Sequence, residues 1–407
     1  MSTDDGISRR DMIVKTAGAA GVAGALTGAG LTPALGLNPQ PLPPGFADQE
    51  PLIDNWGRQL NEVVDVTATL KSDAPDLAEE GGRERHRIYS YLLMKLITRF
   101  WNGNKKGALG HYPQRLKQIT ARNPERYRGD QLSNPGNNRF EWDRYLGHNI
   151  ACLAVDGNGE IIDFDFNHNE FFRSSAEHAE ARMVRRLFSL TSIFDNWKVG
   201  TPISGKPRAA QLNDVTLYTS LESCAQCSGV MSLAGIKQII YMQNDFTAYK
   251  IGNIMYNLAN RNPIRDAKGN PVQDSQGKPV TLPGAPIPIA GSEIQLVEFD
   301  QLNKANLEFF NNSNAAQAAN NKEGAFFIPE KGEPLYDNTI TSFLCSDAAL
   351  DIFNRGAGKL DNKPGSPSWK PKNATPETLT NEQCWEHTKK FYDYADIEGY
   401  RGSPHKL

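Results

Sequence analysis

The sequence predicts an α/β fold of three layers, in which a mixed β-sheet lies between helices. The main observation is the order of apolar runs between residues 149 and 243, which predicts elements in the order β-β-α-β-α-β. A hairpin followed by strands that alternate with helices is typical of a mixed sheet, because helical connections join parallel strands. The chain has 407 residues, of which 39% are hydrophobic and 22% charged, and this is enough to bury a sizeable core.

The first two strands are predicted from a turn that separates two apolar segments. Residues 149–155 form an apolar run, and residues 156–159 (Asp-Gly-Asn-Gly) have the composition of a turn. Residues 160–166 then alternate apolar and acidic side chains, as a strand with two different faces does. Together these segments predict a β-hairpin.

The elements after the hairpin are predicted from apolar periodicity and from capping residues. Ser174 and Ser175 are both suitable N-caps for the next helix. Residues 262–291 are expected to form a loop-rich excursion. The full set of expected elements is a helix at 176–190, a strand at 215–220, a helix at 224–234, a strand at 238–243, one more strand at 294–299 and one more helix at 302–310.

Two extensions flank the predicted domain, which spans residues 140–310. Residues 50–135 are expected to form a helical extension, because residues 88–100 have the periodicity of an amphipathic helix that packs on a core. Residues 311–407 are expected to form a C-terminal extension with two short helical candidates. A last helix docked on the core is expected from its aromatic residues Trp385, Phe391 and Tyr392.

Residues 1–40 are expected to be a signal peptide and linker, outside the fold. The segment Ser-Arg-Arg-Asp-Met-Ile-Val-Lys, which contains Arg9 and Arg10, resembles the twin-arginine export signal, and a Gly/Ala-rich stretch follows it. A membrane anchor is the alternative, but the stretch lacks the bulky apolar residues of a stable span. The resemblance implies that the twin-arginine translocase exports the folded chain to the periplasm or another extracytoplasmic compartment.

Two short motifs carry the candidate chemistry. The first is His178-Ala179-Glu180 at the start of a predicted helix, and the second is Cys224 with Cys227 at a strand-to-helix turn. Cysteines three residues apart in the first turn of a helix lie on one face, so both sulfur atoms can bind one metal ion. The helix N-terminus favours their thiolate forms, and a neutral His178 supplies a third ligand. The motifs therefore predict a zinc site.

Three protein ligands distinguish a catalytic zinc site from a structural one, because the fourth position stays open for a water that zinc acidifies. Glu180 lies close enough in sequence to His178 to move protons there. A redox dithiol is an alternative, but it would not require the histidine motif. A closed zinc knuckle would need a fourth Cys or His nearby in sequence, and His178 could also be an ordinary core histidine. The two motifs together favour the catalytic site.

The segment from about residue 147 to 245 resembles the cytidine deaminase-like superfamily. The likeness is carried by His-Ala-Glu-Ala and by Leu-Tyr-Thr-Ser-Leu-Glu-Ser-Cys-Ala-Gln-Cys-Ser-Gly, which follow the H-x-E and P-C-x-x-C pattern of zinc deaminases. The resemblance implies the α/β/α fold of that superfamily and a Zn²⁺ cofactor held by His178, Cys224 and Cys227. It also implies that Glu180 is the catalytic proton carrier. Relatives commonly build their sites across subunits, so the resemblance leaves both a homo-oligomer and a monomer open.

Single residues near the motifs add further expectations. Ser223 stands where the family has proline before the first cysteine, and its hydroxyl is expected to cap the helix that follows. The family also has an asparagine upstream of the histidine that contacts substrate, and Asn167 and Asn169 are both candidates. His168 is expected to be either a solvated loop residue or part of the pocket.

Cysteine usage bounds the chain further. Five cysteines in 407 residues are too few for a disulfide scaffold. Cys152 is expected in the core of a strand. For Cys345 and Cys384 the sequence leaves both a disulfide and two free thiols open.

These features predict an exported zinc-dependent hydrolase that converts an exocyclic amine of a nucleobase, nucleoside or related heterocycle to a carbonyl and releases ammonia. The net charge of −3 lacks the general attraction to polyanions that most nucleic-acid binders show, so a small-molecule substrate is favoured. Deamination of DNA or RNA is one alternative. A catalytically inactive, zinc-stabilised binding protein is the other.

Overall fold

The computed structural model divides into Met1–Trp56 and Gly57–Leu407. Its described residues all lie in the second unit and are residues 70, 72, 74–101, 148–169, 174–188, 211–245, 251–258, 270, 273, 277, 286–321 and 338–401. The predicted export signal with Arg9 and Arg10 lies outside them. Among the described helices, none has the length and apolarity needed to cross a bilayer.

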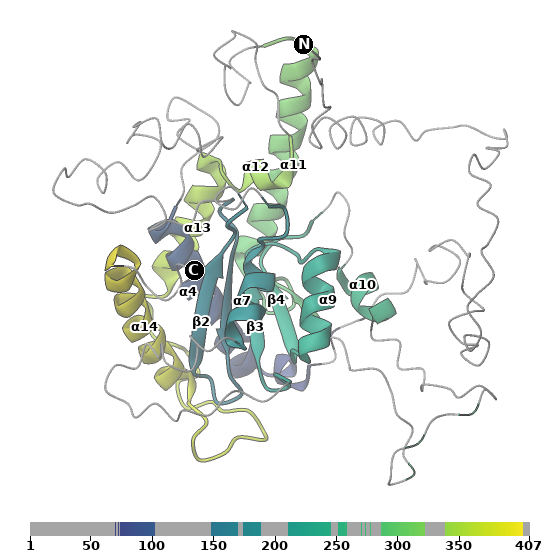
Figure 1. Ribbon diagram of the computed structural model, residues 1–407. Coiled ribbons are helices and arrows are strands. Elements are labelled where there is room, and N and C mark those ends of the chain that lie inside the picture. The colour runs from purple at the N-terminus through teal and green to yellow at the C-terminus, as the bar shows by residue number, and fades with distance from the viewer. Residues whose placement is uncertain are drawn as a thin grey trace. The chain divides into compact units, whose positions relative to one another are not determined.

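A five-stranded mixed sheet forms the centre of this unit (Figure 1). Its strands are β1 (Ala151–Val155), β2 (Ile161–Phe166), β3 (Thr216–Thr219), β4 (Gln238–Tyr241) and β5 (Ile287–Ala290), in the spatial order β2-β1-β3-β4-β5. Strand β1 is antiparallel to β2 and β3, whereas β3, β4 and β5 are parallel. The predicted hairpin and the predicted mixed sheet are both confirmed.

Helices cover both faces of the sheet, as Figure 1 shows. Side-chain contacts from β3 define the two faces, because Thr219 contacts Glu180 on α7 (Ala179–Leu187) and Tyr218 contacts His86 on α4 (Glu80–Arg99). Alongside α7 lies α9 (Ala225–Ala234), which in turn contacts α10 (Ile251–Leu258). Against α4 pack α13 (Asp347–Lys359) and α14 (Asn381–Arg401), with η2 (Pro75–Ala78) at its start. The three-layer α/β/α fold class is therefore confirmed.

The amphipathic helix predicted over 88–100 is observed as the C-terminal part of α4. It contributes fully buried side chains to the core, among them Leu92, Leu93 and Met94. Although residues 80–99 lie in a segment predicted to be an extension, α4 contacts β1 and β3 directly. The domain limits at residues 40, 135 and 310 stay predictions.

Helix α7 begins later than predicted. Its N-cap is His178, whose own side chain makes no capping hydrogen bond. Neither Ser174 nor Ser175 is therefore the N-cap. Ser174 Oγ accepts a hydrogen bond from the backbone N–H of Ala176 at 3.2 Å, which forms a local turn instead. The first helical N–H, that of Ala179, is bound by the Asn167 side-chain oxygen at 2.8 Å. A residue distant in sequence therefore performs the role that was predicted for a local serine.

The fifth strand also differs from the prediction. Residues 294–299 were expected to be a strand, but they form a turn and the first turn of α11 (Val297–Ala318). Gln295 has a φ of 57°, which is incompatible with an extended strand. The strand instead occupies 287–290, where Pro288 is tolerated because β5 is at the edge of the sheet. Helix α11 includes the helix predicted at 302–310.

The C-terminal region is more helical than the two short candidates predicted. It contains the end of α11, α12 (Ile340–Phe343), α13 and α14. The docked last helix is confirmed, because Phe391 on α14 is fully buried and meets Phe164 on β2 at a centroid distance of 5.7 Å. Trp385 donates a hydrogen bond from Nε1 to the Leu360 carbonyl at 2.6 Å, and Tyr392 packs against the core cluster.

The three cysteines outside the metal-binding motif, Cys152, Cys345 and Cys384, are all buried. Cys152 is fully buried on β1, as predicted. Cys345 and Cys384 are both buried, and no disulfide joins them, so the disulfide alternative is not observed. His168 is 2% exposed and donates from Nδ1 to the Phe166 carbonyl at 2.8 Å, so the expectation of a solvated loop residue is wrong.

Candidate metal centre

The beginnings of two neighbouring helices bring the candidate ligands together. His178 is the N-cap of α7 and Cys224 is the N-cap of α9. Cys227 lies in the first turn of α9, on the same side as Cys224, because residues three apart share a helix face. Gln226 donates from Nε2 to the Ala176 carbonyl at 2.9 Å and so ties the first turn of α9 to the segment before α7.

The spacing of the three donor atoms fits zinc. The two Cys Sγ atoms are 3.7 Å apart, and His178 Nδ1 lies 3.4 Å from Cys224 Sγ and 3.6 Å from Cys227 Sγ. A tetrahedral zinc ion with ordinary Zn–S and Zn–N bond lengths requires S···S of about 3.8 Å and S···N of about 3.6 Å. The observed distances match those between the ligand atoms of a tetrahedral zinc ion, so this His/Cys/Cys group could hold zinc.

The electrostatics of the site favour a thiolate ligand. The pKa of Cys224 is lowered to about 4 by its hydrogen bond with Cys227, with a further contribution from its hydrogen bond with His178. In return, the pKa of Cys227 is raised well above its ordinary value, because it holds the shared proton and is buried. A bound cation would displace that proton, since metal ligation requires deprotonated sulfur.

Glu180 lies beside these ligands, within the first turn of α7. Its carboxylate is 4% exposed, and burial raises its pKa above that of an ordinary glutamate. Oε1 accepts hydrogen bonds from Ser223 Oγ at 2.8 Å and from Thr219 Oγ1 at 3.3 Å. Oε2 lies 3.5 Å from Cys227 Sγ. One oxygen is therefore held by hydroxyl groups, and the other faces the ligand cluster.

Ser223 does not have its predicted role. The N-cap of α9 is Cys224, without any side-chain capping bond, so the Ser223 hydroxyl does not cap the helix. It binds Glu180 instead. Sequence spacing could not show this contact, because the two residues belong to different elements that the sheet brings together.

The turn before α9 is held by a second buried carboxylate, which was not among the predicted site residues. Glu222 is 8% exposed and accepts the backbone N–H groups of Asp245 at 2.9 Å and Ile251 at 2.7 Å. Its own N–H donates to the Gln243 carbonyl at 2.8 Å. The only sequence signal for this role is the position of Glu222 two residues before Cys224.

The two candidate asparagines bind backbone groups. Asn167 is 2% exposed and its Oδ1 is engaged by the Ala179 N–H, next to His178. Asn169 Oδ1 accepts from the His148 N–H at 3.3 Å. Asn167 therefore orders the start of α7, and a substrate contact by either asparagine stays a prediction.

A network of buried ion pairs joins α7 to β2. Arg182 is 3% exposed, and its Nε lies 3.2 Å from Asp165 while its Nη1 lies 2.6 Å from Glu177. Arg186 reaches the same Asp165 at 3.4 Å and Asp163 at 2.7 Å. Because Glu177 directly precedes His178, this network anchors both ends of the segment that carries the histidine and Glu180.

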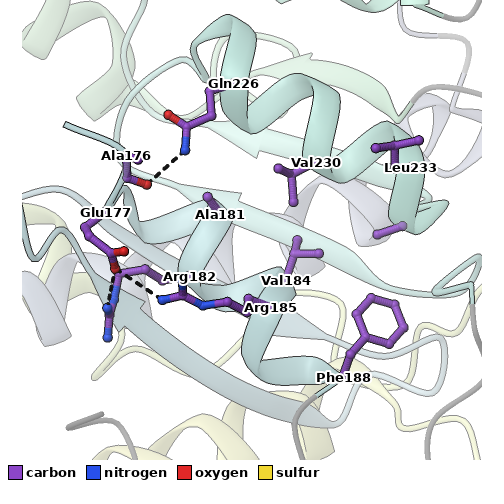
Figure 2. Close-up of a pocket in the computed structure, with 11 residues that line it drawn as sticks. Ala176, Glu177, Ala181, Arg182, Val184, Arg185, Phe188, Gln226, Val230 and Leu233 are labelled. Carbon is purple, nitrogen blue, oxygen red and sulfur yellow. Dashed lines mark hydrogen bonds and ion pairs between the residues drawn. The ribbon is translucent and has the colours of Figure 1, made fainter. Parts of the chain in front are cut away.

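A groove of about 470 Å³ runs over the outer surfaces of α7 and α9 (Figure 2). Its apolar part includes Phe188 and Leu233, which are 42% and 79% exposed. Glu177, Arg182 and Arg185 form a polar end, where dashed lines in Figure 2 mark the ion pairs. The lining residues do not include the three candidate metal ligands or Glu180, so this groove is separate from the metal centre.

Comparison with known proteins supports the zinc centre. Residues 139–243 match the family model described as the cytidine and deoxycytidylate deaminase zinc-binding region. No curated protein matches the chain. One similar solved structure, from a study described as "Biochemical and Structural Studies of A-to-I Editing by tRNA:A34 Deaminases at the Wobble Position of Transfer RNA", is 18% identical, covers 36% of this chain and 82% of that chain, and has a TM-score of 0.22. Residues 139–243 therefore form a zinc-binding region similar to that of the cytidine and deoxycytidylate deaminases.

Proposed function

We propose that this chain is a zinc-dependent hydrolytic deaminase, which converts an exocyclic amine on a nitrogen heterocycle to a carbonyl and releases ammonia. The observation that carries the proposal is the His178, Cys224 and Cys227 triangle with the Glu180 carboxylate directly beside it. Three ligands leave one zinc coordination position open, as catalytic zinc sites do. The matching family model supports the same chemistry.

The reaction replaces nitrogen by oxygen at one ring carbon. A water oxygen forms a bond to that carbon, and the exocyclic C–N bond breaks. One water proton leaves with the amine as ammonia, and the other remains on the neighbouring ring nitrogen. When bound, zinc would supply Lewis acidity that makes the water a better nucleophile near neutral pH.

Glu180 is the residue proposed to transfer protons. Its Oε2 is the oxygen that faces the ligand cluster, so it is placed to take a proton from water and to deliver it to the substrate nitrogen. Burial raises the pKa of this carboxyl, so its carboxylate binds a proton more readily than an exposed glutamate does. Glu180 therefore carries protons in both directions within one catalytic cycle.

The substrate is proposed to be a free base, nucleoside or related heterocycle. Support comes from the net charge of −3 and from the ordinary share of charged residues, which do not provide a general attraction to a polyanion. Single-stranded DNA and RNA belong in the same assay, because they test the alternative substrate class directly.

The decisive experiment measures ammonia release by the wild type and by Glu180→Gln, both loaded with zinc, across bases, nucleosides and oligonucleotides. We expect release from at least one small heterocycle by the wild type and a loss of about 10²–10⁴-fold in the variant, as for removal of a general acid–base group. If both proteins hold zinc and neither releases ammonia from any of these compounds, the zinc-stabilised binding protein replaces the enzyme as the explanation.

Export through the twin-arginine translocase is part of the proposal, and it is supported only by the motif with Arg9 and Arg10. Replacement of both arginines by lysine should retain the protein in the bacterial cytoplasm, whereas the wild type should reach the periplasm. Cell fractionation with an antibody against the chain measures this. Whether the chain assembles into homo-oligomers is tested by sedimentation of the purified protein.

A further inference from the structure

We propose that Ser223 is a positioning residue for Glu180, whose hydroxyl fixes the orientation in which the carboxylate meets the metal centre. The inference rests on the proposed function, since it assigns the role of one residue within that site. It concerns the position at which this chain has serine before the first cysteine of its metal-binding pair.

The contact is short and completely enclosed. Ser223 Oγ donates to Glu180 Oε1 at 2.8 Å, and the two residues are 1% and 4% exposed. A hydroxyl-to-carboxylate hydrogen bond in a buried site is charge-assisted and stronger than a bond between neutral groups. At this level of burial, bulk water cannot replace the hydroxyl if it is removed. The bond therefore constrains Glu180 more than an exposed contact would.

A second hydroxyl reinforces the same orientation. Thr219, at the end of β3, donates from Oγ1 to the same Oε1 atom at 3.3 Å. Because both donors bind one oxygen, rotation of the carboxylate about its last bond would break both hydrogen bonds. The other oxygen, Oε2, is then held toward Cys227 Sγ at 3.5 Å. The two hydroxyls thus fix the orientation of the carboxylate and leave its second oxygen facing the ligands.

Orientation matters because glutamate has a long side chain with rotational freedom. Restricting a free glutamate side chain costs conformational entropy, which a prearranged carboxylate does not have to lose during the reaction. A helix-capping role does not explain Ser223, since Cys224 is the N-cap of α9 and no side-chain capping bond is present there. The hydroxyl is therefore assigned to Glu180.

The first experiment compares Ser223→Ala, Ser223→Thr and a matched control, Ser228→Ala. Ser228 is also a buried serine of this region, on α9, but its hydroxyl has no hydrogen-bond partner among the described residues. We expect zinc content to be unchanged in all three variants. In Ser223→Ala, kcat should fall about 10–100-fold with little change in KM, as for loss of a group that supports a catalytic residue. Ser223→Thr should recover most of kcat, and Ser228→Ala should match the wild type.

The second measurement does not depend on activity. Crystal structures of zinc-loaded wild type and Ser223→Ala, at a resolution that separates carboxylate conformers, should show one Glu180 orientation in the wild type and two or more in the variant. Thr219→Val, which removes the weaker donor, should give a smaller change in the same direction.

Two results would overturn the assignment. One is an unchanged Glu180 orientation in Ser223→Ala together with wild-type kcat. The other is a loss of kcat in Ser228→Ala as large as in Ser223→Ala, because this would show a general sensitivity of α9 to side-chain removal. If the wild type releases no ammonia from any compound, the proposed function fails, and the crystallographic comparison still decides whether Ser223 positions Glu180.

Discussion

Strand β2 meets two different environments, because its side chains alternate between the two faces of the sheet. Toward α7, Asp165 is completely buried against Arg182. Toward α4 and α14, Phe164 and Phe166 lie in an aromatic cluster that includes Phe391. Both faces are thus buried, but one is held by ion pairs and the other by apolar packing.

The difference corresponds to what each face carries. Apolar packing is non-directional and supplies stability in proportion to buried area. Arginine–carboxylate pairs are directional, because the guanidinium donors have a fixed geometry. Helix α7 lies on the charged face, with His178 as its N-cap and Glu180 in its first turn. The orientation of these two side chains relative to the cysteines of α9 determines whether the metal centre forms. We infer that the charge network orients α7, whereas the aromatic face contributes apolar packing without orienting the ligands.

The largest expected effect is on the charged face. Asp165→Asn leaves Arg182 and Arg186 without their shared carboxylate, and loss of one partner from a buried ion pair lowers the free energy of unfolding by about 3–5 kcal/mol. Urea denaturation of the full chain measures it. Asp361→Asn is the control, since that carboxylate is 68% exposed in its pair with Lys95 and its loss should change stability by about 1 kcal/mol or less. Equal effects of the two variants would contradict the comparison.

A smaller effect is expected on the aromatic face. Phe164→Leu removes the ring that stacks on Phe100 and meets Phe391 edge-on, while it keeps most of the apolar volume. The free energy of unfolding should fall by about 1–3 kcal/mol. Zinc affinity should stay at the wild-type value, whereas it should fall in Asp165→Asn. Isothermal titration with zinc after chelation distinguishes these outcomes, and weakened binding in Phe164→Leu would show that orientation depends on both faces.

The smallest effect, when it is followed over a single pH unit, is a pH dependence from the same apolar face. His86 is fully enclosed beside Tyr218, with its Nδ1 2.8 Å from the hydroxyl, and burial lowers its pKa to about 3, assisted by the charges of Arg85 and Lys237. The unfolded chain binds this proton near pH 6.5, so the folded state loses stability as the pH falls from about 6.5 toward 3, by up to about 1.4 kcal/mol per pH unit.

Replacement of His86 by Gln should therefore flatten the stability curve between pH 6.5 and 5.5, measured by urea unfolding at several pH values. Some slope should remain, because burial also lowers the pKa of His168 on the other face. Parallel curves for the wild type and His86→Gln would show that His86 does not contribute.

The sequence was sufficient to predict the elements whose signals are local. The hairpin at β1 and β2 and the helix after Cys224 depend on short spacings along the chain. Both motifs of the candidate metal centre are also short, but His178 and Cys224 are 46 residues apart and the fold brings them together. The same local signals predicted the acidic alternation in β2. They did not show that the acidic face is buried, because its arginine partners lie one helix later in the chain.

Errors arose where a distant residue replaced a local one. The start of α7 was misplaced because Asn167, and not a serine next to the helix, binds its first free N–H. Ser223 was expected to cap α9, but the fold brings Glu180 within 2.8 Å of it. Strand β5 was missed because Pro288 disfavours a strand, and only its edge position makes that proline acceptable.

The central claim is that His178, Cys224 and Cys227 form a zinc centre, and metal analysis tests it most directly. Protein purified from cells supplied with zinc should contain about one zinc ion per chain by mass spectrometry of the metal, as for a site with three protein ligands. Cys227→Ala should lose the metal, while Cys152→Ala, which changes a buried cysteine on β1, should keep it. A wild-type protein without zinc, or a Cys227→Ala variant with as much zinc as the wild type, would contradict the account.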